Sequence, residues 1–257
     1  METVPLLATQ IIQVKNNIAE ERALSVVNEA RLSLTVNGDL WLSFLCTPIN
    51  QIELAVGFLY NEDIINSKNQ IADVRLCDSG DNVDVWLTFP ATKPNSWLRT
   101  SGCSGGFTAD EQKNNNPIKP QSIQLTHSQV FNIIQELFEH QHLYQESGGI
   151  HISALSDGNK LILSAEDIGR HNTLDKLAGM KLLQQISAPT KIIITSGRVT
   201  SEMMQKALRL DAEMVITRTS PSVLSMKMAD INGVTLIGYA KRSQFNIYTH
   251  PERIIPD

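Results

Sequence analysis

The sequence predicts an α/β protein in which a smaller β-rich domain precedes a larger domain of alternating strands and helices. Two patterns along the 257 residues predict this division. Up to about residue 92, apolar and polar residues mostly alternate with the two-residue period of strands. In the second half, short apolar runs and helical patterns follow one another, as in sheets covered by helices. We therefore expect domains at 1–92 and 121–257, joined by a flexible linker at 93–120.

The first domain is predicted to contain two hairpins and one helix. The dipeptide Asn37-Gly38, typical of tight hairpin turns, separates two alternating runs. Cys46 and Cys77 fall within apolar strand patterns, so we interpret both as structural residues. The expected elements are hairpin strands at 31–36 and 40–45, a helix at 49–60, and hairpin strands at 74–76 and 83–89.

The second domain is predicted to begin with a helix and a hairpin, followed by repeated helix and strand units. Short connections between such units predict parallel strands covered by helices. By analogy, this order of elements is that of the cytidine-deaminase-like fold. The expected elements are a helix at 127–142, hairpin strands at 150–155 and 160–165, helices at 172–184, 201–210 and 221–229, and strands at 191–195, 214–217 and 235–239.

Composition indicates an ordinary globular protein of the cytoplasm. The chain is 42% hydrophobic and carries a formal net charge of −5, which argues against broad binding to nucleic acid or to acidic membranes. Its three cysteines show no regular spacing, so we expect no disulfide framework and a reducing compartment. The first residues lack the basic start of a signal peptide, and no apolar run approaches the ~18 residues that span a bilayer.

Cys103 is the candidate reactive residue. It stands in the run Ser101-Gly102-Cys103-Ser104-Gly105-Gly106, where glycines permit backbone conformations closed to other residues. A polar segment without periodicity follows, which is typical of a long loop. Free cysteines are usually small buried hydrophobes, but those have apolar neighbours at strand or helix spacing. We therefore predict a reactive thiol presented on a loop.

Three turns between a strand and a helix are alike, and they indicate an anion-binding site. In a parallel sheet such turns lie at the carboxyl ends of the strands, where ligands bind. Helix N-termini offer free N–H groups, and arginine can grip phosphates through two donors. The alternative is that the polar residues only cap helices and the arginines pair with Asp167 and Glu202. The turns are 166–172, 195–201 and 218–222, with candidate ligand residues Arg170, His171, Ser196, Gly197, Arg198 and Arg218.

Zinc chemistry is not predicted at this edge of the sheet. At the start of a helix in this fold, His171 could be a zinc ligand together with two cysteines from the next helix. The corresponding turn has no cysteine, whereas a catalytic zinc site needs three protein ligands. We expect His171 to hydrogen-bond to a ligand or to the backbone, and we predict no intrinsic metal. After the last strand, Lys241 and Arg242 could close over the same ligand.

Several of these motifs resemble those of one family, the formate dehydrogenase accessory sulfurtransferases (FdhD). The resemblance runs over nearly the whole chain and rests on several long motifs. Those motifs are 148–151, 167–172 with Asp175 and Lys176, and 195–203, together with 53–59 in the first half and 246–250 near the end.

The resemblance implies a cytoplasmic sulfurtransferase that matures molybdenum-dependent formate dehydrogenase. Such proteins are thought to receive sulfur from a cysteine desulfurase as a cysteine persulfide and to pass it to the molybdenum of bis-molybdopterin guanine dinucleotide. The family cysteine corresponds to Cys103, and homodimers are typical. The family's cofactor-binding segment corresponds approximately to Tyr239, Ala240, Lys241, Arg242, Ser243 and Gln244.

One departure from the family pattern bears on mechanism. Many members carry two cysteines as CxxC, and here Gly106 occupies the second position. A persulfide relay needs only one sulfur, so transfer through Cys103 stays possible, whereas a step that needs two thiols does not. Two other interpretations stay open: a non-catalytic carrier that binds the cofactor and delivers it to formate dehydrogenase, and a cysteine hydrolase, which would need a histidine beside Cys103 and an oxyanion hole.

Overall fold

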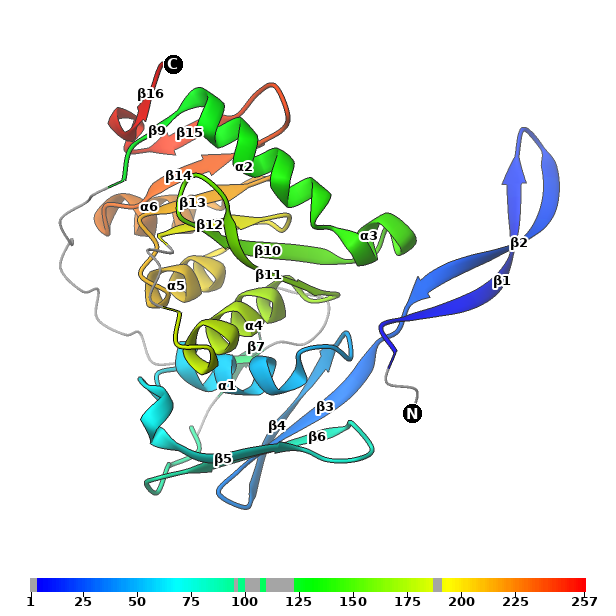
Figure 1. Ribbon diagram of the computed structural model, residues 1–257, viewed down its shortest axis with the longest axis vertical. Helices are drawn as coiled ribbons and strands as arrows, with labels where there is room; N and C mark the ends of the chain where they lie inside the picture. Colours follow the sequence, from blue (N-terminus) through cyan, green and yellow to red (C-terminus); the bar gives the residue numbers. More distant parts are fainter. Residues whose placement is uncertain (1–3, 95–96, 100–106, 110–122, 187–190) are drawn as a thin grey trace.

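A six-stranded mixed sheet forms the larger part of the molecule (Figure 1). The computed structural model describes residues 4–94, 97–99, 107–109, 123–186 and 191–257. The central strands β12, β13 and β14 run parallel, β10 is antiparallel to both of its neighbours, and β15 is antiparallel to β14. In spatial order the strands are β11 (Leu161–Asp167), β10 (His151–Ser156), β12 (Ile192–Thr195), β13 (Met214–Thr217), β14 (Thr235–Gly238) and β15 (Asn246–Thr249).

Helices cover both faces of this sheet, which explains why its central strands are apolar without alternation. Ile192 and Ile194 pack with the helix α2 (His127–Glu139) on one face, and Ile193 packs on the other. That second face is covered by α4 (Arg170–Leu183), α5 (Ser201–Arg209) and α6 (Val223–Ile231). Beside α2 lie the short helix α3 (His142–Ser147), the parallel pair β9 (Leu125–Thr126) and β16 (Ile254–Ile255), and the 3₁₀ turn η2 (Pro251–Arg253).

A second, four-stranded sheet is built from the first part of the chain. The predicted hairpins are both present, and the turn between the first pair has Asn37 and Gly38 at φ 51° and 89°, as a tight hairpin turn requires. Parallel pairing of β3 with β6 joins the two hairpins. The elements, in spatial order, are β4 (Asp39–Cys46), β3 (Ala30–Val36), β6 (Asn82–Leu87) and β5 (Ile71–Leu76), with the helix α1 (Gln51–Asn61) and the 3₁₀ turn η1 (Lys68–Gln70).

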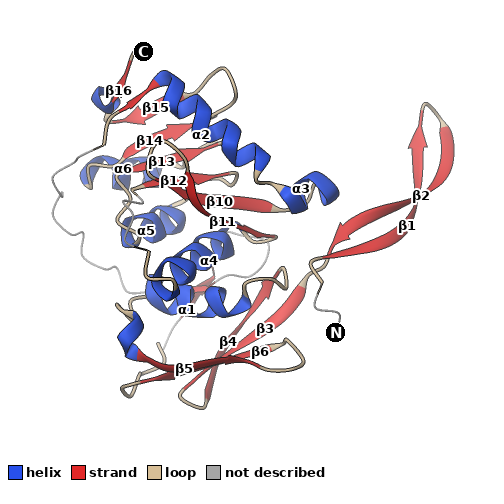
Figure 2. Cartoon of the chain, in the orientation of Figure 1, coloured by secondary structure: helices blue, strands red, loops and turns tan. Residues whose placement is uncertain are grey.

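The helices α1 and α4 join the two parts of the molecule by crossing at two glycines (Figure 2). A Cβ atom on Gly57 of α1 would lie only 1.7 Å from the backbone oxygen of Asp175. A Cβ on Gly179 of α4 would lie 2.0 Å from the backbone oxygen of Glu53. The two backbones therefore touch without side chains between them, which no residue larger than glycine permits.

A long two-stranded arm was not predicted from the sequence. The strands β1 (Leu6–Lys15) and β2 (Ile18–Val27) pair along their whole length and project away from the body (Figures 1 and 2). Their turn is Asn16-Asn17, with both residues at positive φ. Asparagine tolerates this conformation, so the turn works without the glycine that usually signals it.

Several boundaries differ from the prediction. The helix expected at 127–142 ends at Glu139, because His140 and Gln141 leave the helical conformation before α3 begins. Pro221 lies before the helix rather than at its first position, since Ser222 is the N-cap of α6. The edge strand β15 was not predicted.

Of the two cysteines expected to be structural, Cys46 is buried in the core as expected. Cys77 instead lies in the turn after β5, where its sulfur accepts a hydrogen bond from Asn82 N–H (3.2 Å).

The segment between the two halves of the chain is described only in part. The strands β7 (Trp97–Arg99) and β8 (Phe107–Ala109) pair antiparallel, and Cys103 falls between them in the chain, outside the described residues. Most of the predicted linker at 93–120 also lies outside them, so the domain boundaries stay a prediction. The cytidine-deaminase-like assignment also stays a prediction, whereas the mixed α/β class is confirmed.

None of the described helices is both long and apolar enough to span a bilayer.

We expect Gly57→Ala to destabilise the protein by at least about 2 kcal/mol, since the added methyl forces two packed backbones apart. Urea unfolding monitored by circular dichroism measures this. Gly149→Ala is the matched control, because its Cβ would meet only a methyl of Val27, at 3.2 Å. A Gly57→Ala protein as stable as the control would show that the crossing relaxes easily and does not hold the two parts together.

Candidate functional site

The candidate site lies along one edge of the six-stranded sheet. The strands β11, β12, β13 and β14 end at this edge, and the antiparallel strand β10 begins there, with His151 opposite Asp167. Four strand spacings separate β11 from β14, so the edge is about 19 Å long. Each predicted turn follows one of these strands, and the topology therefore brings the three turns to one side of the molecule.

A buried ion pair fixes the first turn. Asp167, the last residue of β11, lies 2.6 Å from the ammonium of Lys176, and both side chains are fully buried. The same carboxylate accepts hydrogen bonds from Gly169 N–H (2.7 Å), from the Asn172 amide (2.9 Å) and from Thr47 N–H (3.1 Å). A buried charge persists only when it is paired and hydrogen-bonded in this way. Thr47, which follows β4 of the four-stranded sheet, thus helps to position a turn of the six-stranded sheet.

This arrangement decides one half of an alternative left open by the sequence, the pairing of an arginine with Asp167. Asp167 was considered as a partner of an arginine, but its carboxylate is occupied by Lys176, Asn172 and backbone donors. If the polar residues only capped helices, Asn172 at the expected start of its helix would be a cap, yet the N-cap of α4 is Gly169, without a side-chain cap. The N-cap Thr200 of α5 also makes no side-chain cap, whereas Ser222 caps α6 by accepting a hydrogen bond from Ser225 N–H.

The second turn lies against the first because Gly197 has no side chain. A Cβ at this position would be 2.8 Å from the Cβ of Arg170, so the stem of Arg170 passes where any other residue would stand. The neighbouring Ser196 accepts a hydrogen bond from Ile152 N–H (3.0 Å) and lies 3.2 Å from Nδ1 of His151. Arg170, Ser196 and His151 therefore form one cluster from three different strand ends.

Hydroxyl groups connect the three turns beneath this cluster. Ser153 lies 2.6 Å from Thr173 of α4 and donates to Thr195 of β12 (2.9 Å). Thr195 in turn accepts from Gly197 N–H (3.2 Å), whose carbonyl accepts from Thr217 of β13 (2.6 Å). Buried polar groups that satisfy one another in this way favour a single arrangement of the surrounding backbone. The edge is consequently held rigid from β10 to β13.

His151 is the residue of this cluster that the sequence reasoning missed as a ligand candidate. Burial, followed by the positive charge of Arg170, lowers its pKa, and His171 and Arg198 act in the same direction. A neutral imidazole can donate one hydrogen bond to an anion without adding charge. The signal was present in the motif 148–151, but only pairing of β10 with β11 places His151 beside Arg170.

His171 lies beside an acid of the next helix. Its Nε2 lies 3.3 Å from a carboxylate oxygen of Glu202, which also accepts from the Thr200 hydroxyl (3.0 Å). Burial lowers the pKa of His171, and the hydrogen bond with Glu202 opposes that effect. Within the described part of the chain, no three His, Cys, Asp or Glu side chains gather as a metal site would require.

The three arginines differ in their surroundings. Arg170 is buried at the start of α4, Arg198 is exposed in the second turn, and both act electrostatically on His151. The guanidinium of Arg218 instead stacks on the ring of Phe138, 4.4 Å from its centre. Phe138 belongs to α2, which covers the face of the sheet opposite to α4. Arg218 therefore extends toward the other face from the first two arginines.

The segment after β14 extends the same edge. Tyr239 N–H donates to Thr219 O (2.8 Å) and Ala240 N–H to Thr217 O (3.0 Å), so this segment is attached to the third turn. Tyr239 has a positive φ of 51° and a side chain that is 44% exposed. Ala240 is buried, whereas the four side chains after it are exposed: Lys241, Arg242, Ser243 and Gln244.

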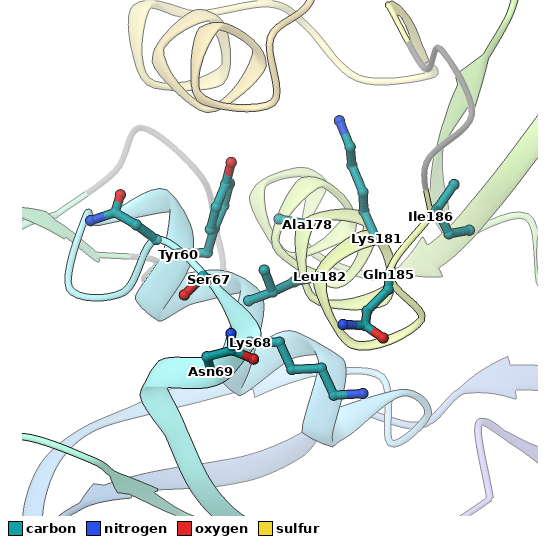
Figure 3. A pocket seen from close by; sticks show the side chains of 10 residues that line it. Tyr60, Ser67, Lys68, Asn69, Ala178, Lys181, Leu182, Gln185 and Ile186 are labelled. Carbon is teal, nitrogen blue, oxygen red and sulfur yellow. The ribbon is translucent and has the colours of Figure 1, made fainter.

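A pocket of about 420 Å³ lies at the opposite end of α4 (Figure 3). Tyr60 of α1 and Lys181 of α4 are among its lining residues, together with residues 66–69. The ammonium groups of its two lysines already donate hydrogen bonds to backbone carbonyls at helix ends, Lys68 to Leu183 O (2.9 Å) and Lys181 to Leu210 O (3.3 Å). With about 21 Å of α4 between them, the pocket and the candidate site are separate.

The buried histidines predict an acid-sensitive fold. Both His151 and His171 have native pKa values below the ordinary 6.5, so below that pH the unfolded chain binds protons that the folded chain rejects. Their contribution to stability is therefore complete above pH 6.5 and is lost as pH falls through the native pKa values. A tenfold difference in proton affinity between the folded and unfolded chains corresponds to about 1.4 kcal/mol of stability.

Urea unfolding of wild type and His171→Gln at pH 7.5, 6.5 and 5.5 tests this expectation. The variant should lose less stability on acidification than wild type, and His142→Gln, at an exposed position, should match wild type. Equal losses in wild type and His171→Gln would contradict the assignment.

Comparison with known proteins agrees with this fold and shows the family. The family model described as the FdhD/NarQ family matches residues 27–255. Two curated proteins named "Sulfur carrier protein FdhD", from Staphylococcus aureus strains bovine RF122 / ET3-1 and MRSA252, are each 34% identical over 235 residues, which is 89% of this chain and 89% of theirs.

A solved structure supports the fold. The crystal structure of a putative formate dehydrogenase accessory protein from Desulfotalea psychrophila superposes with a TM-score of 0.84 at 24% identity, over 98% of this chain and 100% of that one. With the family model covering most of the sequence, these matches establish that this chain belongs to the FdhD/NarQ family.

Proposed function

We propose that this protein is a sulfurtransferase that carries sulfur on Cys103 for the maturation of formate dehydrogenase. Its relatives at 34% identity are named sulfur carrier proteins, and this is the observation that carries the proposal. The donor would be a cysteine desulfurase, and the acceptor the molybdenum of bis-molybdopterin guanine dinucleotide. Three cysteines without regular spacing fit a cytoplasmic setting, where thiols stay reduced.

The first chemical step is an exchange between two sulfur centres without net oxidation. The thiolate of Cys103 attacks the outer sulfur of the donor's persulfide, one S–S bond forms, and the donor's S–S bond breaks. The donor cysteine leaves as a thiolate, and Cys103 then carries the terminal sulfur. Only one thiol of this chain takes part, which is consistent with Gly106 at the second cysteine position of the family motif.

The sheet edge supplies groups suited to the phosphates of such a cofactor. Arg170 and Arg198 provide positive charge, His151 and Ser196 provide neutral polar groups, and α4 and α5 begin there, where helix N-termini favour anions. An edge of about 19 Å accommodates an extended dinucleotide. We assign the nucleotide and phosphate part of the cofactor to this edge, with Tyr239 and Lys241 at its far end.

The alternative, a carrier that binds the cofactor without sulfur chemistry, needs the same edge but not Cys103. Replacement of Cys103 therefore separates the two. We expect Cys103→Ala to bind guanosine diphosphate like wild type and to gain no sulfur when incubated with a cysteine desulfurase and cysteine. Mass spectrometry should show one added sulfur on Cys103 of wild type, and Cys46→Ala, at a buried position, should still be loaded. Sulfur loading or full formate dehydrogenase maturation by Cys103→Ala would overturn the proposal.

Binding of guanosine diphosphate tests the edge itself. We expect Arg198→Ala to weaken binding about tenfold, since a charge-assisted hydrogen bond contributes roughly 1.5–3 kcal/mol. Arg218→Ala should have less than a threefold effect, because that side chain stacks on Phe138. Isothermal titration calorimetry at two salt concentrations provides the measurement, with Arg31→Ala in the four-stranded sheet as the control. Unaltered affinity in Arg198→Ala would exclude the second turn from the site.

A further inference from the structure

One hydrogen bond of the candidate site, between Ser196 and His151, can run in either direction. Oγ of Ser196 accepts from Ile152 N–H (3.0 Å) and lies 3.2 Å from Nδ1 of His151. A hydroxyl group has two lone pairs and one proton, so this Oγ keeps one lone pair and its proton for further partners. The protonation of Nδ1 therefore determines whether Ser196 donates to the imidazole or accepts from it.

The two directions leave different groups for a ligand. If Nδ1 has no proton, the Ser196 hydroxyl donates to it, and only Nε2–H of His151 can point to an anion. If both ring nitrogens are protonated, Nδ1–H donates to Ser196 instead, and the hydroxyl proton becomes available to another acceptor. Protonation of His151 thus adds a positive charge and a hydrogen-bond donor at the same place.

Basic groups around His151 oppose its protonation in the free protein. They are Arg170 and His171 of α4 and Arg198 of the second turn. Burial is the largest effect, and with these groups it lowers the pKa of His151 below the ordinary 6.5. Asp167 acts in the opposite direction, but its carboxylate is already paired with Lys176 (2.6 Å). A bound anion would supply a further negative charge, and an opposite charge within about 4–6 Å favours the protonated ring.

We propose that the edge binds its anion together with a proton from solvent, which His151 takes up while Ser196 turns its hydroxyl proton to the anion. His151 suits this role because it is half-buried at the first position of β10, beside the second turn that carries Ser196. His171 suits it less, because that ring is buried and its Nε2 lies 3.3 Å from Glu202. This role rests on the proposed function, since it requires the cofactor's pyrophosphate at this edge.

Uptake of a proton on binding makes the complex weaker as pH rises. The ring is charged only in the complex when pH lies between the pKa of His151 in the free protein and its higher pKa in the complex. Across that interval, affinity falls by up to about tenfold for each pH unit. Below it the ring is charged in both states and above it in neither, so affinity there no longer depends on this proton.

Isothermal titration calorimetry with diguanosine 5′,5′-pyrophosphate tests the proton uptake. The phosphates of this probe are diesters that do not titrate between pH 6 and 8, so protons taken up in that range belong to the protein. Titrations at pH 7 in two buffers of different ionisation enthalpy count those protons. We expect net uptake by wild type and by His142→Gln, at an exposed position of α3, and none by His151→Gln.

The same titrations at pH 6 and pH 8 give the affinities. Wild type should bind about tenfold more tightly at pH 6, whereas His151→Gln should show little change. Uptake that persists in His151→Gln, or wild-type binding without uptake, would overturn the role of His151 and leave the proposed function intact. Absence of binding by wild type would contradict the proposed function as well.

Replacement of Ser196 tests the turning of the hydroxyl. At pH 8 this hydroxyl donates to the neutral ring, so Ser196→Ala should weaken binding less than about threefold. At pH 6 the loss should be about tenfold, because a charge-assisted hydrogen bond to the anion is removed. Ser153→Ala, in the hydroxyl network beneath the cluster, is the control and should weaken binding equally at both pH values. An equal loss at both pH values in Ser196→Ala would show a purely structural role and overturn this part of the proposal.

Discussion

The contact between α1 and α4 at Gly57 and Gly179 is the constraint on which the rest of the structure depends. It brings two backbones together at a distance that leaves no room for a Cβ atom. The helix α4 is consequently enclosed, with the six-stranded sheet on one side and α1 on the other, and residues 170–180 are buried. Because Arg170 and His171 begin this helix, its position determines where the candidate anion site presents them.

Buried ion pairs fix how α4 is oriented, as well as how close it lies to its neighbours. Lys176 pairs with Asp167 at the end of β11, and Asp175 pairs with Lys206 of α5 at 2.6 Å. Asp175 also accepts from the Asn61 amide at the end of α1 (2.7 Å). Such pairs contribute little net stability, because burying the ions is costly. They act on specificity instead, since a shifted helix would leave a charge without its partner.

Much of the fold could be predicted because its signals are local. Alternation and the Asn37-Gly38 turn located the first hairpins, and apolar runs followed by helical patterns located β12, β13 and β14 with their helices. The arm carries exposed aliphatic residues on both faces, so it shows no clear alternation, and its Asn-Asn turn lacks glycine. The start expected for α4 was wrong, because the Asn172 amide donates to Asp167 instead of capping the helix, a contact that forms only in the folded turn.

The candidate site was predictable as an edge of the sheet but not as an arrangement of side chains. Sequence order places Arg170, Arg198 and Arg218 at the ends of strands, yet it does not tell toward which face of the sheet each side chain extends. Arg218 turns to Phe138 of α2, while Arg170 lies against Gly197 beside His151. An extended ligand along this edge would therefore meet Arg170, Arg198 and neutral donors at one end and the exposed segment of Tyr239 and Lys241 at the other. Two ends that differ in this way would hold the proposed dinucleotide in one direction, which two equivalent ends would not do.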